Sequence, residues 1–291
     1  MPHAPSSESV VAGATVLITG AAHGMGALYA RRAAHEGATR IALWDIDTAA
    51  TGDLIAELES ATTTVRGFAV DLSDRDSIVS AATQTQEVFG GPDILINNAG
   101  IVRGKAFWEH DPVADIELTM RINSLAPMWL TRHVLPGMMA ERTRPKRILN
   151  IASAAGTLAH PNMSVYASSK WAMIGWSESL RLELQRAGHD HMAVTTYCPS
   201  YVSTGMFAGA RGPLWTPVMT PAKAVDAAWQ GMLAGRPVVA KPWTVKLGMA
   251  ARGVLPTRAW DVVASRVFGV YSSMDHFTGR SGDHAAGSAD R

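Results

Sequence analysis

Short apolar runs alternate with segments of helical periodicity along the first two hundred residues of the chain. The runs are rich in β-branched side chains and carry few polar residues, which is typical of strands buried on both faces. They are ATVLIT (14–19), RIALWD (40–45), TVRGFAV (64–70), DILIN (93–97), RILNIAS (147–153) and AVTTYC (193–198). Strands that alternate with helices form parallel βαβ units. The pattern therefore predicts an α/β protein with a Rossmann-type, doubly wound parallel sheet in a three-layer sandwich.

The same pattern predicts one domain with an appendage. Residues 1–12 are polar and contain proline, so we expect a flexible N-terminus there. Residues 13–240 form the predicted Rossmann-fold domain, and no repeat of roughly 20–50 residues divides it. Residues 241–280 form a C-terminal amphipathic extension, and 281–291 are small and polar, as in a disordered tail.

Composition narrows the classes of function. The net charge is +1, which gives no overall reason to expect a nucleic-acid partner. A single cysteine, Cys198, fits a reducing compartment, and neither a signal peptide nor a membrane-spanning apolar run is recognisable, so we expect a cytoplasmic protein. His189 and His191 lack partners at metal-ligand spacing, and Ser153 is outside a G-x-S-x-G sequence. Neither a metal site nor a serine-hydrolase site is expected.

A glycine-rich segment follows the first predicted strand. The sequence ITGAAHGMG (18–26) places Gly20, Gly24 and Gly26 directly before a predicted helix. Glycines allow the backbone to turn tightly and to approach a pyrophosphate, whose charge interacts favourably with the helix N-terminus. Alone, such a segment fits a structural turn equally well, but its place in a βαβ unit favours a dinucleotide site.

Acidic residues at the ends of the second and third strands concern the choice of cofactor. Asp45 is placed to accept hydrogen bonds from the ribose hydroxyls and to repel a 2′-phosphate, which favours NAD over NADP. Alternatively Asp45 caps the next helix, although Asp47 or Thr48 is better placed to do so. His23 could be partly cationic and tolerate a phosphate. Asp71 is placed to contact the adenine edge.

A tyrosine and a lysine stand four residues apart in YASSK (166–170). On a helix, Tyr166 and Lys170 share one face, so the ammonium group would favour the phenolate. A tyrosine normally loses its proton near pH ~10, so proton exchange near neutrality needs such a partner. The alternative is a pair of side chains on a solvated helix face.

Five ordered motifs resemble the short-chain dehydrogenase/reductase family over roughly residues 12–240. They are TGAAHGMG (19–26), NNAG (97–100), Asn123 in RINSLAP, Ser153 in NIASAAG, and YASSK. The segments LWDID, SAAG and CPSYVSTGMF look most similar to the hydroxysteroid and retinol dehydrogenases of that family. The resemblance implies an oxidoreductase, an alcohol dehydrogenase or carbonyl reductase, that transfers a hydride between NAD(H) and a lipophilic alcohol or its carbonyl compound.

The resemblance also implies a role for each member of a catalytic set. Tyr166 would be the general acid in carbonyl reduction and the general base in alcohol oxidation. Lys170 would lower the pKa of Tyr166 and hold the nicotinamide ribose, and Ser153 would hydrogen-bond the substrate oxygen. Asn123 would hold a water that links Lys170 to solvent. Taken singly, Ser153 reads as a helix cap and Asn123 as a buried polar group. A catalytically silent nucleotide-binding scaffold or sensor is the alternative, and it has no need for all four.

The predicted cofactor contacts combine the glycine segment, the strand ends and the family motifs. They are Gly20, His23, Gly24, Met25, Gly26, Asp45, Ile46, Asp71, Leu72, Asn98, Ala99, Gly100, Tyr166, Lys170, Pro199, Val202 and Thr204. Asn97 would support the central sheet. One departure from the family pattern is Ser200, which stands where relatives commonly have glycine. A positive φ would cost energy there, so the local backbone path could differ.

Large apolar residues in a segment rich in glycine and proline predict a mobile substrate lid at about 204–220. With residues ahead of Tyr166 they suggest an apolar pocket for a lipophilic substrate. Its predicted lining is Leu158, His160, Met163, Tyr201, Met206, Phe207 and Trp215. The alternative is that half of these side chains are ordinary core. His160 is interpreted as a wall or surface residue and not as a catalyst.

Basic and apolar residues alternate beyond Lys241. Such a segment could lie on a membrane surface, cover the pocket or pack across a subunit interface, and we favour packing. The family resemblance implies a homodimer or homotetramer that pairs through helices at about 111–138 and 164–186.

Overall fold

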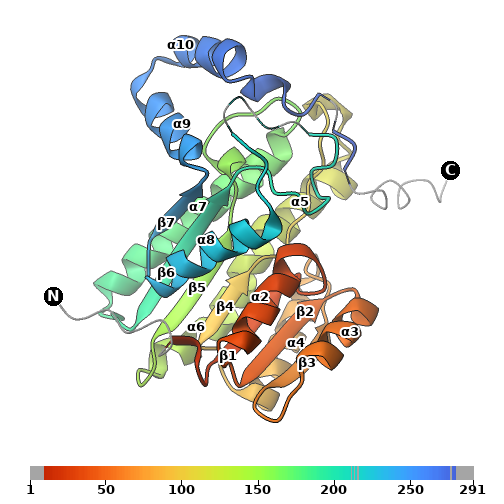
Figure 1. The fold of residues 1–291 in the computed structure, drawn as a ribbon, viewed down its shortest axis with the longest axis vertical. Helices are drawn as coiled ribbons and strands as arrows, with labels where there is room; N and C mark the ends of the chain where they lie inside the picture. The colour runs from red at the N-terminus through yellow and green to blue at the C-terminus, as the bar shows by residue number, and fades with distance from the viewer. Residues whose placement is uncertain (1–9, 211, 213, 215, 276, 280–291) are drawn as a thin grey trace.

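The computed structural model describes residues 10–210, 212, 214, 216–275 and 277–279. Seven parallel strands form one twisted sheet in the order β3-β2-β1-β4-β5-β6-β7 (Figure 1). The strands are β1 (Thr15–Thr19), β2 (Arg40–Asp45), β3 (Thr64–Ala69), β4 (Ile94–Asn97), β5 (Lys146–Ile151), β6 (Met192–Pro199) and β7 (Val238–Lys241). The predicted Rossmann-type sheet is confirmed. The sequence pattern did not predict β7. This strand has only four residues, too few for a recognisable apolar run, and it pairs only with the end of β6.

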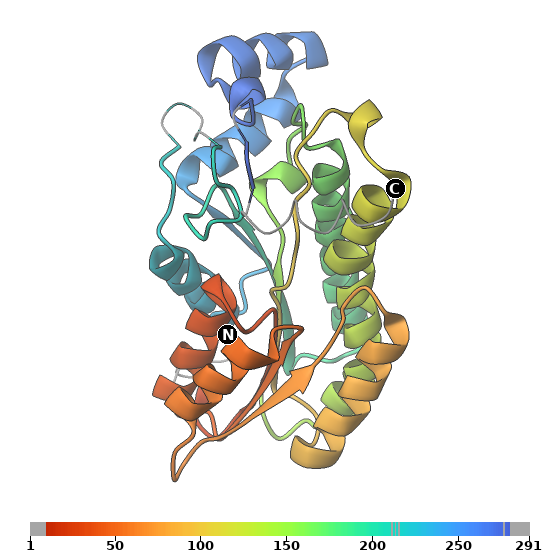
Figure 2. The same ribbon diagram turned by 90° about the vertical axis from the view of Figure 1, so that its right-hand side faces the viewer.

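Helices cover both faces of the sheet. They are α2 (Gly24–His35), α3 (Thr48–Leu58), α4 (Arg75–Phe89), α5 (Leu118–Met120), α6 (Ala126–Ala140), α7 (Ser164–Arg186), α8 (Pro221–Leu233), α9 (Trp243–Val254) and α10 (Thr257–Val262). Short turns are η1 (Phe107–Glu109), η2 (Pro112–Glu117), η3 (Arg121–Leu125), η4 (Ala154–Gly156), η5 (Val263–Val267) and η6 (Val270–Ser272). Helices α2, α3 and α8 cover one face, and α4, α6 and α7 cover the other (Figure 2).

Alternate residues of each strand supply the two halves of the core. Val16 and Ile18 of β1 pack beneath α2 and α8, whereas Leu17 between them packs beneath α4 and α6. Val10 and Val11 are fully buried in the first of these clusters. The packed core therefore includes Val10 and Val11, which lie inside the segment that the sequence pattern assigns to a flexible N-terminus.

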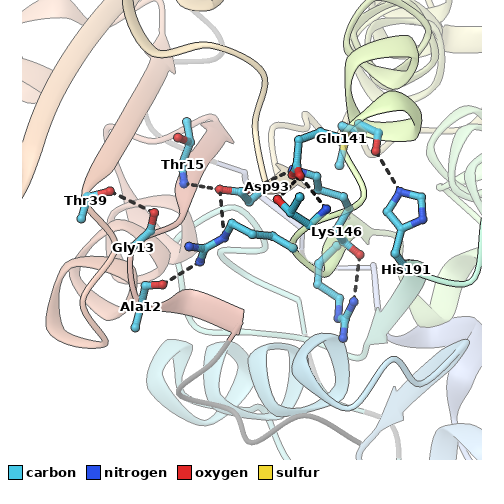
Figure 3. Close-up of polar contacts among 12 residues, drawn as sticks. Ala12, Gly13, Thr15, Thr39, Asp93, Glu141, Lys146 and His191 are labelled. Carbon is cyan, nitrogen blue, oxygen red and sulfur yellow. Dashed lines mark hydrogen bonds and ion pairs between the residues drawn. The ribbon is translucent and has the colours of Figure 1, made fainter. Parts of the chain in front are cut away.

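An ionic network joins the amino-terminal ends of three strands (Figure 3). Asp93, just before β4, accepts hydrogen bonds from the backbone N–H of Thr15 at 2.9 Å and from Nζ of Lys146 at 2.6 Å. Lys146 also pairs with Glu141, and this contact lowers the pKa of Glu141 to about 2. The lysine side chain is only 4% exposed. The network therefore holds β1, β4 and β5 together at their amino-terminal ends, opposite the carboxyl ends of the strands.

Lys146→Ala is expected to lower the free energy of unfolding by about 3 kcal/mol, because it leaves the buried carboxylate of Asp93 without its nearest cation. Glu141→Gln is the matched comparison, and it should cost less than about 1 kcal/mol because that side chain is 41% exposed. Urea denaturation of both variants measures the difference. Equal losses in the two variants would contradict this account of the network.

The chain after β7 forms a separate helical cap. In Figures 1 and 2, α9 and α10 stand beyond the carboxyl ends of the strands, at the top of both views. Within the ranges that the structure describes, no helix is both long and apolar enough to cross a membrane.

Candidate active site

A cleft opens at the carboxyl ends of the strands, where the strand order reverses between β1 and β4. Sixteen of the predicted cofactor contacts line it: Gly20, His23, Gly24, Met25, Asp45, Ile46, Asp71, Leu72, Asn98, Ala99, Gly100, Tyr166, Lys170, Pro199, Val202 and Thr204. The cleft is also lined by residues that the sequence motifs do not predict: Val70, Ile101, Ile122, Ile151 and Ala152. These are apolar residues next to strand ends or in a helical turn, and nothing in their sequence pattern separates them from core.

The glycine segment forms the tight connection from β1 to α2. A Cβ atom at Gly26 would lie 1.9 Å from the carbonyl oxygen of Gly20, so this position admits only glycine. Gly26 itself is buried beneath the turn and does not line the cleft. The N-cap residue of α2, His23, makes no side-chain capping hydrogen bond. The start of α2 therefore presents backbone N–H groups to the cleft, which suits a pyrophosphate.

The carboxylate of Asp45 is held by two backbone groups. Oδ2 accepts a hydrogen bond from the N–H of Ala22 at 2.9 Å, and Oδ1 accepts one from the N–H of Asp47 at 3.0 Å. The cap of α3 is Asp47, which accepts from the N–H of Ala50 at 3.0 Å, so the alternative that Asp45 caps this helix is wrong. That bond is the main reason why the pKa of Asp47 is lowered. His23 lies with Nε2 2.8 Å from Oδ2 of Asp47.

The NNAG segment joins the end of β4 to the glycine segment. Nδ2 of Asn98 donates hydrogen bonds to the carbonyl oxygens of Thr19 and Gly20, both at 3.0 Å. Asn97 points into the sheet layer, where Nδ2 donates to Oδ1 of Asn150 at 2.7 Å. A Cβ atom at Gly100 would lie 3.3 Å from Nζ of Lys170. The backbone at Gly100 therefore forms a close floor beneath the lysine.

Ser153, Tyr166 and Lys170 meet at the inner end of the cleft. Ser153 follows β5 and caps η4, where its Oγ accepts from the N–H of Ala155 at 3.1 Å. Ser153 also lies near enough to the phenol of Tyr166 to lower the pKa of that group. Nζ of Lys170 donates to the carbonyl oxygen of Ile151 at 2.9 Å and lies 5.8 Å from the centre of the Tyr166 ring. Tyr166 and Lys170 are both buried, so the alternative of a solvated helix face is wrong.

Burial sets the protonation of this group of side chains. It raises the pKa of Tyr166 above its ordinary value, and the nearby side chain of Ser153 acts in the opposite direction. Burial also lowers the pKa of Lys170 to about 8. Near neutral pH the lysine is therefore mostly cationic and the tyrosine keeps its proton, which are the states suited to donating a proton from Tyr166.

Asn123 lies in the π-helical turn η3, between α5 and α6. Its Oδ1 accepts from the N–H of Ile101 at 2.9 Å, and its Nδ2 donates to the carbonyl oxygen of Ile101 at 2.9 Å and to Oγ of Ser169 at 3.0 Å. The side chain thus fixes the segment after NNAG against the start of α7. A π turn breaks the regular helical hydrogen bonding and often marks a functional site. Helical periodicity in the sequence could not show it.

A second, mostly apolar pocket adjoins the cleft and shares Ser153, Ser200 and Phe207 with it. Among the predicted pocket residues, Leu158, His160, Met163, Tyr201 and Phe207 line it. Met206, which is also a predicted pocket residue, lines the adjoining cofactor cleft. Trp215 lies outside the described residues. The C-terminal extension contributes residues that the sequence analysis did not assign to the pocket: Thr244, Val245, Gly248, Trp260, Phe268 and Val270.

Aromatic rings and a neutral imidazole define the pocket's character. Phe207 packs edge to face against Tyr166, with ring centres 5.8 Å apart, and against Tyr201 at 5.3 Å. Burial lowers the pKa of His160 to about 4, so its ring is neutral at physiological pH. The hydroxyl of Tyr201 is already bonded to Ser273 at 2.9 Å. The pocket therefore offers mostly apolar surface, together with two buried polar atoms that lack a hydrogen-bond partner among the described residues, Nδ1 of His160 and Nε1 of Trp260.

Ser200 occupies the position where the sequence departs from the family pattern. Its φ is not positive, and its N–H donates to the carbonyl oxygen of Lys241 at 2.9 Å. The serine therefore takes ordinary dihedral angles, and the backbone is tied to β7 at this point. The described residues contain no group of His, Cys, Asp and Glu side chains that could hold a metal ion.

Comparison with known proteins identifies the class that this fold and site define. A model of the short chain dehydrogenase family matches residues 14–213, so the chain belongs to the short-chain dehydrogenase family. It is thus an oxidoreductase whose cofactor is NAD(H) or NADP(H), as the family resemblance implied.

Individual relatives and one solved structure agree with this assignment. Estradiol 17-beta-dehydrogenase 11 of Rattus norvegicus is 34% identical over 264 residues, which cover 90% of this chain and 87% of the relative. Epidermal retinol dehydrogenase 2 of Mus musculus is 31% identical over 274 residues, 93% of this chain and 87% of the relative. A short chain dehydrogenase/reductase from Burkholderia phymatum, solved in complex with NAD, shares the fold with a TM-score of 0.74 at 24% identity, covering 84% of this chain and 95% of that chain.

Proposed function

We propose that this protein interconverts a lipophilic alcohol and its ketone or aldehyde with NAD(H). The observation that carries the proposal is the position of Ser153, Tyr166 and Lys170, buried where the dinucleotide cleft meets an apolar pocket. A substrate oxygen placed beside Ser153 has the cleft on one side and apolar walls on the other. The names of the steroid and retinol dehydrogenases that the chain resembles support a substrate of this kind. Turnover with graded alcohols tests it.

Each side chain of the set has a distinct task. Ser153 donates a hydrogen bond to the substrate oxygen, which orients it and stabilises the charge that develops on it. Tyr166 gives a proton to that oxygen during reduction and removes one during oxidation. Lys170 favours the phenolate by its charge, and Asn123 holds the neighbouring loop and relays protons through water. The bound cofactor supplies or accepts the hydride.

These tasks distinguish an enzyme from a silent scaffold. A nucleotide-binding scaffold needs only the glycine segment and the strand ends. It gains nothing from burying a lysine whose pKa falls to about 8 beside a tyrosine. Burying these two groups costs free energy, and only an enzyme has a use for them, so their burial favours an enzyme over a scaffold.

NAD is the proposed cofactor in preference to NADP. The carboxylate of Asp45 lines the cleft and is fixed by two backbone N–H groups, which supports a hydrogen bond to a ribose hydroxyl. Nε2 of His23 already interacts with the carboxylate of Asp47, so this nitrogen is less available to bind a 2′-phosphate.

Asp45→Ser is expected to reduce the preference for NAD over NADP by about tenfold or more, because the variant no longer repels a 2′-phosphate. NAD affinity should also fall, since the N–H groups of Ala22 and Asp47 lose their acceptor. Steady-state kinetics with both cofactors measure the ratio. Asp53→Ser, at an exposed position of α3, is the control and should leave it unchanged. A wild-type preference for NADP would overturn the assignment.

The proposal also covers the domain organisation, the oligomeric state and the location of the protein. We still expect a substrate lid at about 204–220 and a catalytic domain at 13–240, with a C-terminal extension that contributes residues to the pocket. A homodimer or homotetramer would pair through η2 to α6 and through α7, whose outer faces expose Leu125, Trp171 and Leu182. A cytoplasmic location remains our expectation.

A further inference from the structure

Helix α9 carries apolar side chains on two opposite faces. Its inner face contributes Thr244, Val245 and Gly248 to the pocket. Its outer face carries four apolar residues at helical spacing, together with one lysine: Trp243, Leu247, Ala250, Val254 and Lys246, all exposed. Trp243 is 66% exposed, Leu247 44% and Val254 84%. We call these five residues the α9 outer face. A helix that is apolar on both sides normally packs against something on both sides.

The charge around this face has one sign. Lys246 lies among the apolar residues, and Lys241, Arg258 and Arg266 are exposed on neighbouring segments. Arg252 is different, because it turns inward, stacks on the ring of Trp171 and donates to the carbonyl oxygen of Thr157. Between residues 241 and 270 the single acidic residue is Asp261, which accepts a hydrogen bond from Tyr271. The surroundings of the α9 outer face are therefore strongly basic.

The terminal segments outside the described residues offer little apolar surface to cover this face. Residues 280–291 contain no large apolar side chain, and residues 1–9 contain only Met1. A second copy of the chain would supply apolar surface, but a two-fold contact would bring the same basic residues of both copies together. A bilayer with anionic lipids accommodates both properties, since tryptophan and leucine enter the interfacial region and lysine and arginine meet the headgroups.

We propose that the α9 outer face, with the basic residues of α10 and η5, docks on an anionic lipid membrane. The location of α9 links membrane docking to substrate access. The residues on its inner face, with Trp260 and Phe268, wall the apolar pocket. α9 and α10 project beyond the strands at the end of the molecule where the site opens (Figures 1 and 2). Docking would bring the pocket wall to the surface in which lipophilic alcohols dissolve; this link to substrate access, unlike the docking itself, rests on the proposed function.

Vesicle sedimentation of the full chain, without cofactor or substrate, tests the docking. The wild type is expected to sediment with vesicles of phosphatidylcholine mixed with phosphatidylserine, more weakly with phosphatidylcholine alone, and more weakly in high salt. The triple variant Trp243→Ser, Leu247→Ser, Val254→Ser should lower the partition coefficient by about tenfold or more. Lys246→Glu, Arg258→Glu and Arg266→Glu together should lower it by about 100-fold or more, since each basic residue near an anionic surface contributes about fivefold.

Matched controls lie elsewhere on the surface. Val88→Ser on α4 and Arg40→Glu at the start of β2 remove an exposed apolar residue and an exposed basic residue, and both should sediment like the wild type. Circular dichroism of each variant confirms that it is folded. Failure of the proposed function can be distinguished from failure of the docking proposal. If the protein turns over no alcohol but sediments with anionic vesicles, the proposed function is wrong and the docking proposal stands.

Three results would overturn the docking proposal. The first is a wild type that sediments with neither kind of vesicle. The second is equal binding by the wild type and the two triple variants. The third is a wild type that light scattering shows to be a larger species than the apolar triple variant, which would mean that a second copy covers the face.

Discussion

Tyr166→Phe is expected to lower kcat/KM for both oxidation and reduction by about a thousandfold or more, because the variant lacks the hydroxyl that exchanges the proton in the proposed reaction. Phe207 packs edge to face on the Tyr166 ring, and phenylalanine preserves that contact. The variant should therefore fold normally and bind NAD(H) with an affinity within about threefold of the wild type, a change of less than 1 kcal/mol. Steady-state kinetics and cofactor titration of the same preparation measure the two quantities.

The contrast between chemistry and binding is what identifies the role of Tyr166. A parallel loss of cofactor affinity would mean that the ring only shapes the cleft. A variant that keeps more than about a tenth of the wild-type rate would show that Tyr166 is not the proton donor, since general acid–base groups contribute at least about a hundredfold.

Lys170→Met is expected to lower kcat/KM for alcohol oxidation by about a hundredfold or more at neutral pH, because it removes the cation that favours the phenolate of Tyr166. Oxidation needs Tyr166 as a base, so its rate rises with pH as the phenol loses its proton. Without the positive charge the phenol holds its proton more tightly. The cation is present only below the pKa of Lys170, about 8, so the advantage of the wild type over the variant should be largest below that pH and should shrink as pH rises above it.

The pH profile separates this electrostatic role from a structural one. Lys170 donates to the carbonyl oxygen of Ile151, so its loss also costs a hydrogen bond and some cofactor affinity. Loss of a purely structural lysine would lower the rate by the same factor at every pH, and that result would contradict the assignment. Lys223→Met, on the exposed side of α8, is the control and should leave both rate and profile unchanged.

Much of the fold was predictable because its strands are buried on both faces. Continuous apolar runs such as RIALWD predicted the parallel strands, and residue type and place limited the helix cap to Asp47 or Thr48, of which the structure shows Asp47. The dinucleotide cleft followed from the same logic, since the carboxyl ends of parallel strands meet at one edge. Tyr166 and Lys170 were predictable from their spacing on one helix face.

The lining of the apolar pocket and the π turn at Asn123 depend on contacts between distant segments, which the spacing of residues in the sequence does not reveal. Met206 and Phe207 are adjacent in the chain, yet Phe207 reaches the apolar pocket and Met206 only the cofactor cleft. The C-terminal part of the pocket wall packs against a residue from much earlier in the chain, since Leu158 belongs to one apolar cluster with Trp260 and Val270. The π turn at Asn123 has the same apolar periodicity as an α-helix. Tertiary packing decides these features.

The most direct test of the central claim is the absorbance of reduced nicotinamide when the purified protein receives NAD and a graded panel of alcohols. The panel runs from short polar alcohols to aryl alcohols, retinol and steroids, with NADP and Tyr166→Phe measured beside it. We predict turnover with NAD that increases with the apolar size of the alcohol and disappears in the variant. Equal turnover by the wild type and Tyr166→Phe, or a preference for short polar alcohols, would contradict the account.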